Sequence, residues 1–418
     1  MHNQVLSEML VAPSCWQTQL SCRTAHAGHL PFESDVVIVG AGIGGLAAAL
    51  RALESGCSVT VLEAGEVGCG ASGRNSGFVV PIPSRHSPAS LHHLLGEDTA
   101  PFLAALCETA QSVIEYAPSD LTVKGWVQPM AGAARGAADE LVKNWVRLGV
   151  KVESMEPQAL ENALGTSEYA EGLLFSDAGA IDPLAFVHRL ADTVNRKGGH
   201  IIERCSAVDV RPQARWVNVQ TQRGEIRAGR VFIAGNAYGS AASRRTRRAI
   251  SPLALTLATF AIPQVCHGER LLPFSDNRKD MWFARRLGPA TLLTGCFALP
   301  LQRSARCSAL LQDRIKRLYG IVAQAPEQQW AGWVGLTPDG MPRIHHDNRI
   351  MGWSGCNGRG IALSMLMGQT LMDRLCGING LRLPLSSGTF RTGNALTWLA
   401  QMVIALDRRK QRRTVLAS

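Results

Sequence analysis

Three glycine-rich segments carry residue types and spacings that could bind a long phosphorylated cofactor. The first has the sequence Gly40-Ala41-Gly42-Ile43-Gly44-Gly45. Read as GxGxxG, its first glycine permits a tight turn, its second lets the backbone approach a pyrophosphate, and its third lets a helix pack closely on a strand. The free N–H groups and the positive dipole end of the following helix would then face the phosphates.

An acidic residue follows this segment at the distance expected for ribose binding. Glu63 lies close to the offset of about 20 residues at which such motifs carry a ribose-binding carboxylate. Its charge accepts hydrogen bonds from ribose hydroxyls and repels a 2′-phosphate, which disfavours NADP and leaves NAD and FAD. The expected site also includes Ala64.

The second glycine-rich segment distinguishes between these two cofactors. It comes shortly after Glu63 and has the sequence Gly70-Ala71-Ser72-Gly73-Arg74-Asn75-Ser76-Gly77. A nicotinamide cofactor has no evident need for a second loop of this kind, whereas FAD is longer and offers more acceptors to backbone N–H groups. Ser72 and Arg74 could also offset phosphate charge. The segment therefore favours FAD.

The third glycine-rich segment precedes a predicted helix over residues 361–375. Its sequence is Gly355-Cys356-Asn357-Gly358-Arg359-Gly360, followed by Ile361. A helix N-terminus aimed at N1 and the C2 carbonyl of a reduced flavin stabilises the negative charge there and raises the reduction potential. No histidine or acidic residue is evidently placed to activate the Cys356 thiol, so we expect it to be packed against its neighbours rather than to act as a nucleophile.

A strand, a helix and a second strand surround the first segment. Residues 36–39 form a short apolar, β-branched run typical of a buried parallel strand. The helix that follows has one apolar face and is expected to end at Gly56, and residues 58–62 give a second strand. Together they make a βαβ unit.

Beyond this unit the pattern changes. Helical patterns dominate residues 83–165, which we interpret as part of a second, inserted domain. Further along, Asp182 is expected to cap a helix that begins at Pro183. The predicted helices of these regions cover residues 100–116, 139–148 and 183–197. The predicted strands cover residues 201–210, 231–234 and 350–354, while residues 1–33 show no clear period and order is expected to begin at Asp35.

The 418-residue chain carries a formal net charge of +10, spread along its length. Two short basic clusters are expected to be solvated helix faces or tails: Arg244, Arg245, Arg247 and Arg248, and Arg408, Arg409, Lys410, Arg412 and Arg413. The 11 cysteines include no CxxC pair and are odd in number, which argues against a disulfide framework and for the cytoplasm. No apolar run reaches the roughly 20 residues of a membrane span, and we expect no secretory signal.

With these motifs the chain resembles the D-amino-acid oxidase and glycine oxidase family of FAD enzymes. The resemblance covers about residues 34–380, and its segments follow one another in the family's order. They are residues 35–63, 70–77, the helix after Asp182-Pro183, the strand to Val208, Ala234-Gly235, 330–342 and 355–360. The form of residues 70–77 is closest to the branch that includes γ-glutamylputrescine oxidase.

The resemblance implies an α/β fold with two interleaved parts. One is a Rossmann-like FAD-binding domain with a βαβ unit like that of glutathione reductase. The other is an α+β substrate domain built on a mixed or antiparallel sheet. The expected division is an N-terminal extension (1–33), the FAD-binding domain (34–82, 166–244 and 326–380), the substrate domain (83–165 and 245–325) and a basic C-terminal tail (381–418).

The resemblance also implies roles for individual residues. Glu63 would bind the adenosine ribose, the backbone of Val208 would meet the adenine, and Ala234-Gly235 would line the pyrophosphate. Residues 71–77 and 357–361 would cradle the flavin. The family transfers a hydride from a C–H bond next to nitrogen to flavin N5, and the imine then hydrolyses. FAD is expected to be held non-covalently, and no metal is needed.

Two departures from the family bear on substrate and electron acceptor. Amino-acid oxidases of this family carry, shortly after the equivalent of Trp330-Ala331-Gly332, an arginine that clamps the substrate carboxylate; here that position is Val334, and Arg343 is out of register. We therefore expect an amine without a free α-carboxylate, such as a polyamine derivative or a secondary amine. Sarcosine-oxidising members have a lysine near the flavin that helps oxygen react, and residues 249–278 contain no lysine. The sequence therefore leaves open whether the electron acceptor is O2 or another compound. The flavin carries the chemistry, and Arg343 and Asn357 are the catalytic candidates.

Two other functions stay open at this point. Some relatives carry this flavin domain and modify an aminomethyl group on a wobble uridine of tRNA, which a charge of +10 would suit. The arginine clusters are short and lack interleaved aromatic residues, which argues against nucleic acid. A subunit or sensor that binds FAD without catalysis would also explain Val334 and the missing lysine. The leading hypothesis is an amine oxidase or dehydrogenase.

Overall fold

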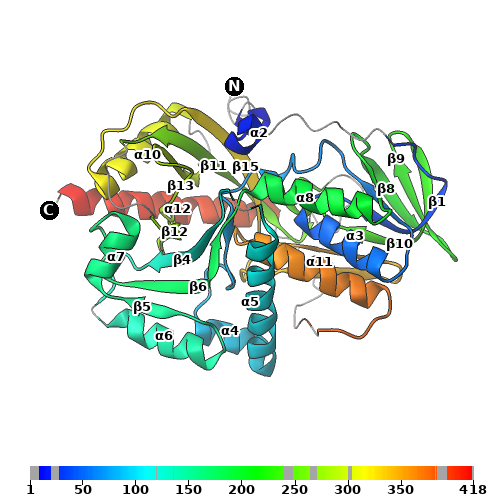
Figure 1. Cartoon of the computed structure of the whole chain (residues 1–418), viewed down its shortest axis with the longest axis horizontal. Coiled ribbons are helices and arrows are strands. Elements are labelled where there is room, and N and C mark those ends of the chain that lie inside the picture. Colours follow the sequence, from blue (N-terminus) through cyan, green and yellow to red (C-terminus); the bar gives the residue numbers. More distant parts are fainter. Residues whose placement is uncertain are drawn as a thin grey trace.

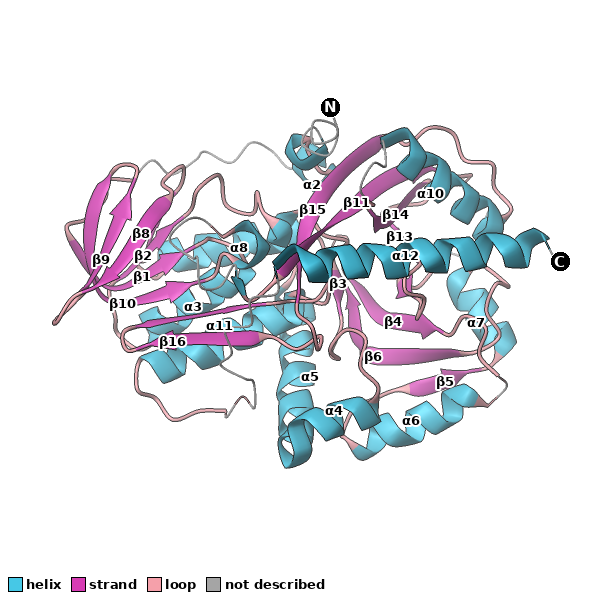
Figure 2. Cartoon of the chain, turned by 180° about the vertical axis from the view of Figure 1, so that it is seen from behind, coloured by secondary structure: helices cyan, strands magenta, loops and turns pink. Residues whose placement is uncertain are grey.

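The computed structural model describes residues 9–19, 28–118, 120–134, 136–239, 248–263, 271–299, 304–381, 383 and 393–416. Within them the strands form two sheets, one of eight and one of nine strands. Figure 1 shows the sheets side by side along the long axis of the molecule, each with its own helices, and Figure 2 shows the same arrangement from behind. None of the described helices is long and apolar enough to cross a membrane.

The first sheet has the parallel centre expected from the βαβ unit. Its main path runs through β16 (Arg343–Asp347), β17 (Ile350–Ser354), β10 (Gly224–Ile233), β1 (Glu33–Val39), β2 (Val59–Leu62) and β7 (His200–Ile202). All neighbours from β17 to β7 are parallel, and β16 is antiparallel to β17. β8 (Ala207–Pro212) and β9 (Val217–Thr221) extend β10 as an antiparallel ribbon. The predicted α/β class and its Rossmann-like half are confirmed.

The helices predicted around this sheet are confirmed. α3 (Ile43–Glu54) joins β1 to β2, and α11 (Ile361–Leu375) follows β17. Asp182 caps α8 (Pro183–Arg196), because its carboxylate accepts hydrogen bonds from two backbone N–H groups of the first turn, at 2.9 and 3.0 Å. These elements depend on local signals, namely a glycine motif, a 3.6-residue apolar period and a cap.

The strand predicted over residues 201–210 is wrong as a single element. The chain turns at Arg204, whose backbone lies in the left-handed region with a φ of 54°. There the Arg204 N–H donates to the carbonyl of Gly65 at 2.8 Å, and the Cys205 N–H donates to the carbonyl of Glu63 at 2.8 Å. As a result β7 pairs with β2, whereas β8 pairs with β9.

The second sheet is mixed, as predicted. Its path runs through β15 (Gln328–Leu336), β11 (Ser251–Ala261), β14 (Thr291–Phe297), β13 (Phe283–Arg286), β12 (Phe274–Ser275), β4 (Val123–Pro129), β6 (Gly172–Ala180) and β3 (Phe78–Val79), with β5 (Glu153–Met155) beside β6. Neighbours are antiparallel except β12 and β4. β3, β6 and β15 fall in ranges predicted for the FAD-binding domain, so the two sheets divide the chain at other points than the predicted domains do.

Helices cover the second sheet and fill the junction between the two sheets. They are α4 (Pro88–Leu95), α5 (Thr99–Tyr116), α6 (Ala137–Arg147), α7 (Pro157–Leu164), α10 (Ser304–Tyr319) and α12 (Gly393–Leu416). α5 and α6 confirm the helices predicted over residues 100–116 and 139–148. α5 contacts both α11 and β6, and in Figure 1 it stands between the two halves of the molecule.

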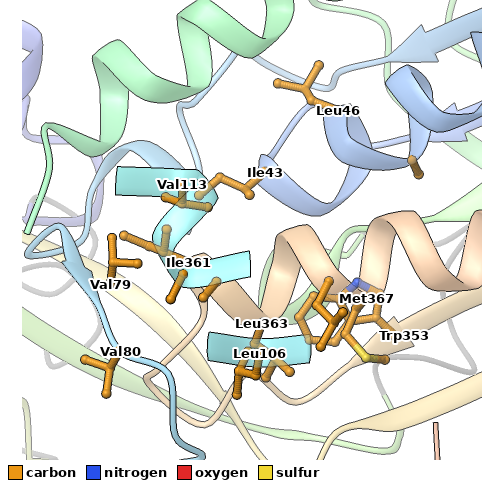
Figure 3. Close-up of a cluster of buried hydrophobic side chains, with 14 of the residues drawn as sticks. Ile43, Leu46, Val79, Val80, Leu106, Val113, Trp353, Ile361, Leu363 and Met367 are labelled. Atoms are coloured by element: carbon orange, nitrogen blue, oxygen red, sulfur yellow. The ribbon is translucent and has the colours of Figure 1, made fainter. Parts of the chain in front are cut away.

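A buried apolar cluster joins the two halves. Ile43 of α3, Val113 of α5 and Ile361 of α11 contribute to it, together with Val79 of β3. Figure 3 shows these side chains gathered at the start of α3 and α11. Because the cluster holds both helix N-termini in one packed unit, the glycine segments that precede them are rigidly placed relative to each other.

The N-terminal extension packs against the fold, although residues 1–33 were expected to be irregular and order to begin at Asp35. It contains α2 (Cys15–Gln19), and Trp16 within it is fully buried. The Trp16 indole N–H donates to the carbonyl of Asn75 at 2.9 Å. The sequence of this stretch is polar and has no period, so it does not predict the contact, which depends on one large side chain.

The basic C-terminal tail is also only partly solvated. It contains the whole of α12, in which Arg408 is buried and donates to the Asp280 carboxylate at 2.6 Å, so the expectation of a solvated cluster is wrong for Arg408. Arg409, Lys410 and Arg248 are exposed, as predicted. Arg244, Arg245 and Arg247, and the side chains of Arg412 and Arg413, for which the same was predicted, lie outside the described residues.

Candidate functional site

A cavity of about 570 Å³ lies between the carboxyl ends of the parallel strands and the second sheet. Its walls include residues of all three glycine-rich segments, which are distant in sequence. Seventeen residues predicted to bind the cofactor line it: Gly40, Gly42, Ile43, Gly44, Glu63, Ala64, Ala71, Ser72, Asn75, Ser76, Ala234, Gly235, Asn357, Gly358, Arg359, Gly360 and Ile361. The other candidates, Gly45, Gly73, Arg74, Val208, Gly355 and Arg343, are not among its lining residues.

The first glycine segment has the geometry that its spacing predicts. Gly40 has a φ of +107°, a conformation that residues with a Cβ rarely adopt. A Cβ on Gly45 would lie 1.9 Å from the Gly40 carbonyl oxygen, so this glycine permits the close packing of α3 on β1. Gly42 lines the cavity, and a Cβ on it would lie 2.8 Å from the hydroxyl oxygen of Ser72, which lines the cavity as well. That hydroxyl accepts a hydrogen bond from the Ile43 N–H at 3.0 Å, at the start of α3.

Glu63 is held in place at the end of β2. Its carboxylate accepts hydrogen bonds from the N–H groups of Ala41, at 2.8 Å, and Gly65, at 3.0 Å. The neighbouring wall is formed by Ser206 and Ala207 at the turn into β8. Val208, whose backbone is predicted to meet the adenine, is the next residue; it is 38% exposed and is not among the residues that line the cavity.

Arg74 points away from the cavity, and its contacts do not support the expectation that it offsets phosphate charge. Its guanidinium is buried and donates to the carbonyls of Ala331 (3.0 Å), Ala12 (2.8 Å) and Met9 (3.3 Å). The Trp330 indole N–H donates in turn to the Arg74 carbonyl at 2.8 Å. Arg74 therefore ties the second glycine segment to β15 and to the N-terminal extension.

We expect a substitution in the N-terminal extension to disturb the cofactor loop. Trp16→Ala should lower the free energy of unfolding by about 3–5 kcal/mol, because a fully buried indole is removed. It should also lower the FAD content, because Asn75 loses its contact with the extension. Denaturant unfolding and the ratio of flavin to protein absorbance measure both effects. Trp398→Ala is the matched control, since Trp398 is 62% exposed; equal unfolding of the two variants would contradict this role.

The third segment is fastened to the end of β15 by Asn357. Its φ is 51°, and its side-chain oxygen accepts a hydrogen bond from the Thr337 N–H at 2.9 Å, while its amide donates to the Gly355 carbonyl at 2.8 Å. These bonds shape the turn that precedes α11, so the side chain has a positioning role. The other catalytic candidate, Arg343, is buried, forms an ion pair with the partly exposed Asp339 at 2.7 Å and is not among the residues that line the cavity.

The rest of the cavity wall comes from the second sheet and its loops, from α6 and from the turn after β10, and it includes residues that sequence reasoning missed. Gln128, Trp145, Tyr238, Lys279 and Phe283 line it, as do Arg85 and His86 from the segment before α4. Lys279 lies one residue after the range 249–278, in which the family's lysine was expected. Val334 of β15 also lines the cavity, and a Cβ on Gly358 would lie 3.9 Å from its side chain. An apolar side chain therefore stands at the position where the resemblance led us to look for an arginine.

The residues present fit FAD. Two helices, α3 and α11, begin at the same cavity, and each is preceded by glycines that let a ligand approach the backbone. The cavity volume lies within the range of about 300–1,000 Å³ typical of ligand sites. A long cofactor could thus contact the first glycine segment with one part and the third with another.

Comparisons with known proteins agree with this fit. The family model described as FAD-dependent oxidoreductase, DAO, matches residues 35–374. γ-Glutamylputrescine oxidoreductase of Escherichia coli is 32% identical over 216 residues, which are 49% of this chain and 49% of that protein. The probable oxidoreductase OrdL of Rhizobium meliloti is 26% identical over 404 residues, 90% of this chain and 92% of that protein. The crystal structure of glycine oxidase from Geobacillus kaustophilus has a TM-score of 0.68 at 21% identity and covers 87% of this chain and 99% of that one.

The matched range includes all three glycine segments and most strands of both sheets. The resemblance drawn from the sequence is therefore confirmed, and so is FAD as the cofactor. The prediction of an oxidoreductase is confirmed as well, whereas neither the RNA-modifying nor the non-catalytic alternative gains support. The chain belongs to the DAO family of FAD-dependent oxidoreductases.

Proposed function

We propose that this protein oxidises a C–H bond next to an amine nitrogen of a small molecule. The FAD held by this cavity would supply the hydride acceptor; loss of a hydride from carbon and a proton from nitrogen would leave an imine, which water would hydrolyse to a carbonyl compound and an amine. The observation that carries the proposal is one cavity that joins the three glycine segments to a wall of apolar and polar side chains from the second sheet. Such a wall can hold a substrate beside the flavin and exclude water.

The lining residues suggest how the cofactor is held, and we expect it to be bound non-covalently. The first glycine segment and Ala234-Gly235 would contact the pyrophosphate, and the Glu63 carboxylate would accept bonds from the ribose. Ser206 and Ala207, together with the backbone of Val208, would lie beside the adenine. The flavin would rest between two groups of residues: Ala71, Ser72, Asn75 and Ser76 on one side, and Asn357, Gly358, Arg359, Gly360 and Ile361 on the other.

The proposed substrate class rests on Val334 of β15, whose side chain lies beside the third glycine segment. Val334 offers no charge there, which supports an amine that is not clamped through an α-carboxylate at β15. Polyamine derivatives and secondary amines meet this condition. The name of the Escherichia coli relative, γ-glutamylputrescine oxidoreductase, points in the same direction. O2 or another acceptor would reoxidise the flavin, and Lys279 in the cavity wall is compatible with either.

A cytoplasmic location is part of the proposal. All cysteines of the described residues are free thiols, and several of them, such as Cys205 and Cys307, are buried. A secreted protein with this many cysteines would be expected to pair at least some of them. The thiols therefore support a reducing compartment.

Anaerobic reduction of the flavin tests the proposed reaction. The FAD-loaded protein would be mixed without air with putrescine, γ-glutamylputrescine, N-methyl amines and α-amino acids, and the loss of visible flavin absorbance would be followed. We expect at least one amine to bleach the flavin. Reduction by none of them would refute amine oxidation, and fastest reduction by α-amino acids would refute the conclusion drawn from Val334.

A further inference from the structure

The last described helix, α12, exposes a stripe of large apolar side chains. They recur at helical spacing and therefore share one face of the helix. Each of them is between 39% and 62% exposed: Trp398, Leu399, Met402, Val403 and Leu406. Single apolar side chains are common on protein surfaces, whereas these five lie within nine residues of one helix and form a continuous patch. A patch of this kind marks a surface that binds a partner or a membrane.

The opposite face of α12 already packs on the second sheet. Ile404 is fully buried in an apolar cluster with residues of β11 and β15. The Thr397 hydroxyl donates to the Pro252 carbonyl at 3.3 Å, and Arg408 forms its ion pair with the buried Asp280. These contacts fix the rotation of the helix about its own axis. The apolar stripe therefore cannot turn inward to be covered by the sheet.

Positive charge continues the stripe toward the C-terminal end of the helix. Arg409 and Lys410 lie about one turn beyond the last apolar residue and are exposed, and two more arginines follow shortly after them in the sequence. Asp407 is the single acidic residue of α12, and its carboxylate accepts a hydrogen bond from the Asp280 N–H at 3.0 Å, on the side of the helix that faces the protein. In Figures 1 and 2 this end of α12 lies at the outer edge of the molecule, far from the first sheet.

We propose that the exposed face of α12 binds the surface of a membrane that contains anionic lipids. The helix would lie parallel to the surface, with its apolar stripe at the boundary between headgroups and acyl chains and its basic end against the headgroups. Apolar burial and positive charge together give an attachment that neither gives alone. The net charge of +10 would add attraction at longer range. A second copy of the chain fits this face less well, because the single carboxylate of α12 is turned inward and cannot meet the basic end of a partner.

Sedimentation of the FAD-loaded protein with lipid vesicles tests this proposal. The vesicles would consist of phosphatidylcholine alone or of phosphatidylcholine mixed with anionic phosphatidylglycerol. We expect at least about 10-fold tighter binding to the mixed vesicles, and loss of that difference at about 1 M NaCl, where the Debye length is about 3 Å. Binding to neither kind of vesicle, or equal binding to both, would overturn the proposal.

Substitutions in the stripe test whether its apolar side chains enter the lipid. Leu399→Ser combined with Leu406→Ser should weaken binding to the mixed vesicles by about 10-fold or more, because two large apolar side chains no longer leave water. Val146→Ser combined with Val322→Ser is the matched control, since these side chains are 54% and 76% exposed on α6 and after α10. Both double variants should keep their FAD, because all four side chains are exposed. Equal vesicle affinity of the two double variants would contradict the role of the stripe.

A second pair of double variants tests the basic end. Arg409→Gln combined with Lys410→Gln should weaken binding to the mixed vesicles by about 10-fold, with little effect on neutral vesicles. Arg211→Gln combined with Arg215→Gln removes the same charge from β8 and the turn after it, at the opposite end of the molecule, and should leave binding unchanged. If both double variants weaken binding equally, net charge alone attracts the protein and α12 is not the docking surface.

The fluorescence of Trp398 locates the contact. Mixed vesicles should shift the emission of the wild-type protein to shorter wavelength, because an exposed indole leaves water, and Trp398→Phe should remove that shift. Light scattering of the protein without lipid tests for the competing occupant. If the wild-type protein is a dimer and the Leu399→Ser, Leu406→Ser variant is a monomer, a second copy covers this face and membrane binding is refuted. None of these measurements depends on the proposed amine oxidation.

Discussion

Gly42→Val should give a folded protein that contains little or no FAD. The new side chain would point to the place where a pyrophosphate approaches the start of α3, and its Cβ would lie 2.8 Å from the Ser72 hydroxyl oxygen. A serine hydroxyl can rotate away, so the fold survives, but the space needed by the phosphates is filled. We expect the ratio of flavin to protein absorbance to fall at least about tenfold, which corresponds to roughly 1.4 kcal/mol or more of lost binding free energy.

Two further glycines provide the comparison for this variant. Gly288→Val adds the same atoms in open space, with nothing within 4 Å of the new Cβ, and should retain its flavin. Gly45→Val places a Cβ 1.9 Å from the carbonyl oxygen of Gly40 and should fail to fold. A yellow, fully loaded Gly42→Val protein would contradict the proposed phosphate site, and loss of flavin from Gly288→Val would show that the assay reports general instability.

Asp280→Ala is expected to destabilise the protein more than any surface substitution. Asp280 is fully buried, and one of its carboxylate oxygens accepts hydrogen bonds from Arg314 of α10 and from Arg408 of α12. Its removal leaves two buried guanidinium groups without a counter-ion. The loss should be about 3–5 kcal/mol in the free energy of unfolding, measured with denaturant. FAD-loaded protein should also bind substrate less well, since Lys279 and Met281, the neighbours of Asp280, line the cavity.

The control for Asp280→Ala is a substitution in a solvent-exposed ion pair. Asp209 pairs with Arg211 at 2.7 Å, but the two side chains are 46% and 70% exposed, so Asp209→Ala should have little effect. Arg408→Met should lose less stability than Asp280→Ala, because the pair between Asp280 and Arg314 survives. If Asp280→Ala unfolds at the same denaturant concentration as Asp209→Ala, the buried cluster does not hold α12 on the second sheet.

The sequence determined those parts of the molecule that depend on neighbours in the chain. The βαβ unit with its glycine motif, the helix over residues 361–375 and the cap at Asp182 were all predictable, because a backbone turn, a 3.6-residue apolar period and a hydrogen bond to the next turn are local. The same local signals were sufficient to identify the family and the cofactor. They also identified most of the cavity wall around the glycine segments.

The tertiary structure alone decided which side chains face one another across the chain. Arg74 was expected at a phosphate, but it binds carbonyls of β15 and of the N-terminal extension instead. Arg408 was expected in solvent, but it meets a carboxylate from a loop distant in sequence. Arg85 and Arg359 face one cavity although nothing in their spacing links them. A long, flexible cation has the same local signature in water, in an ion pair or beside a ligand, and only the packing of distant elements determines which of these it becomes.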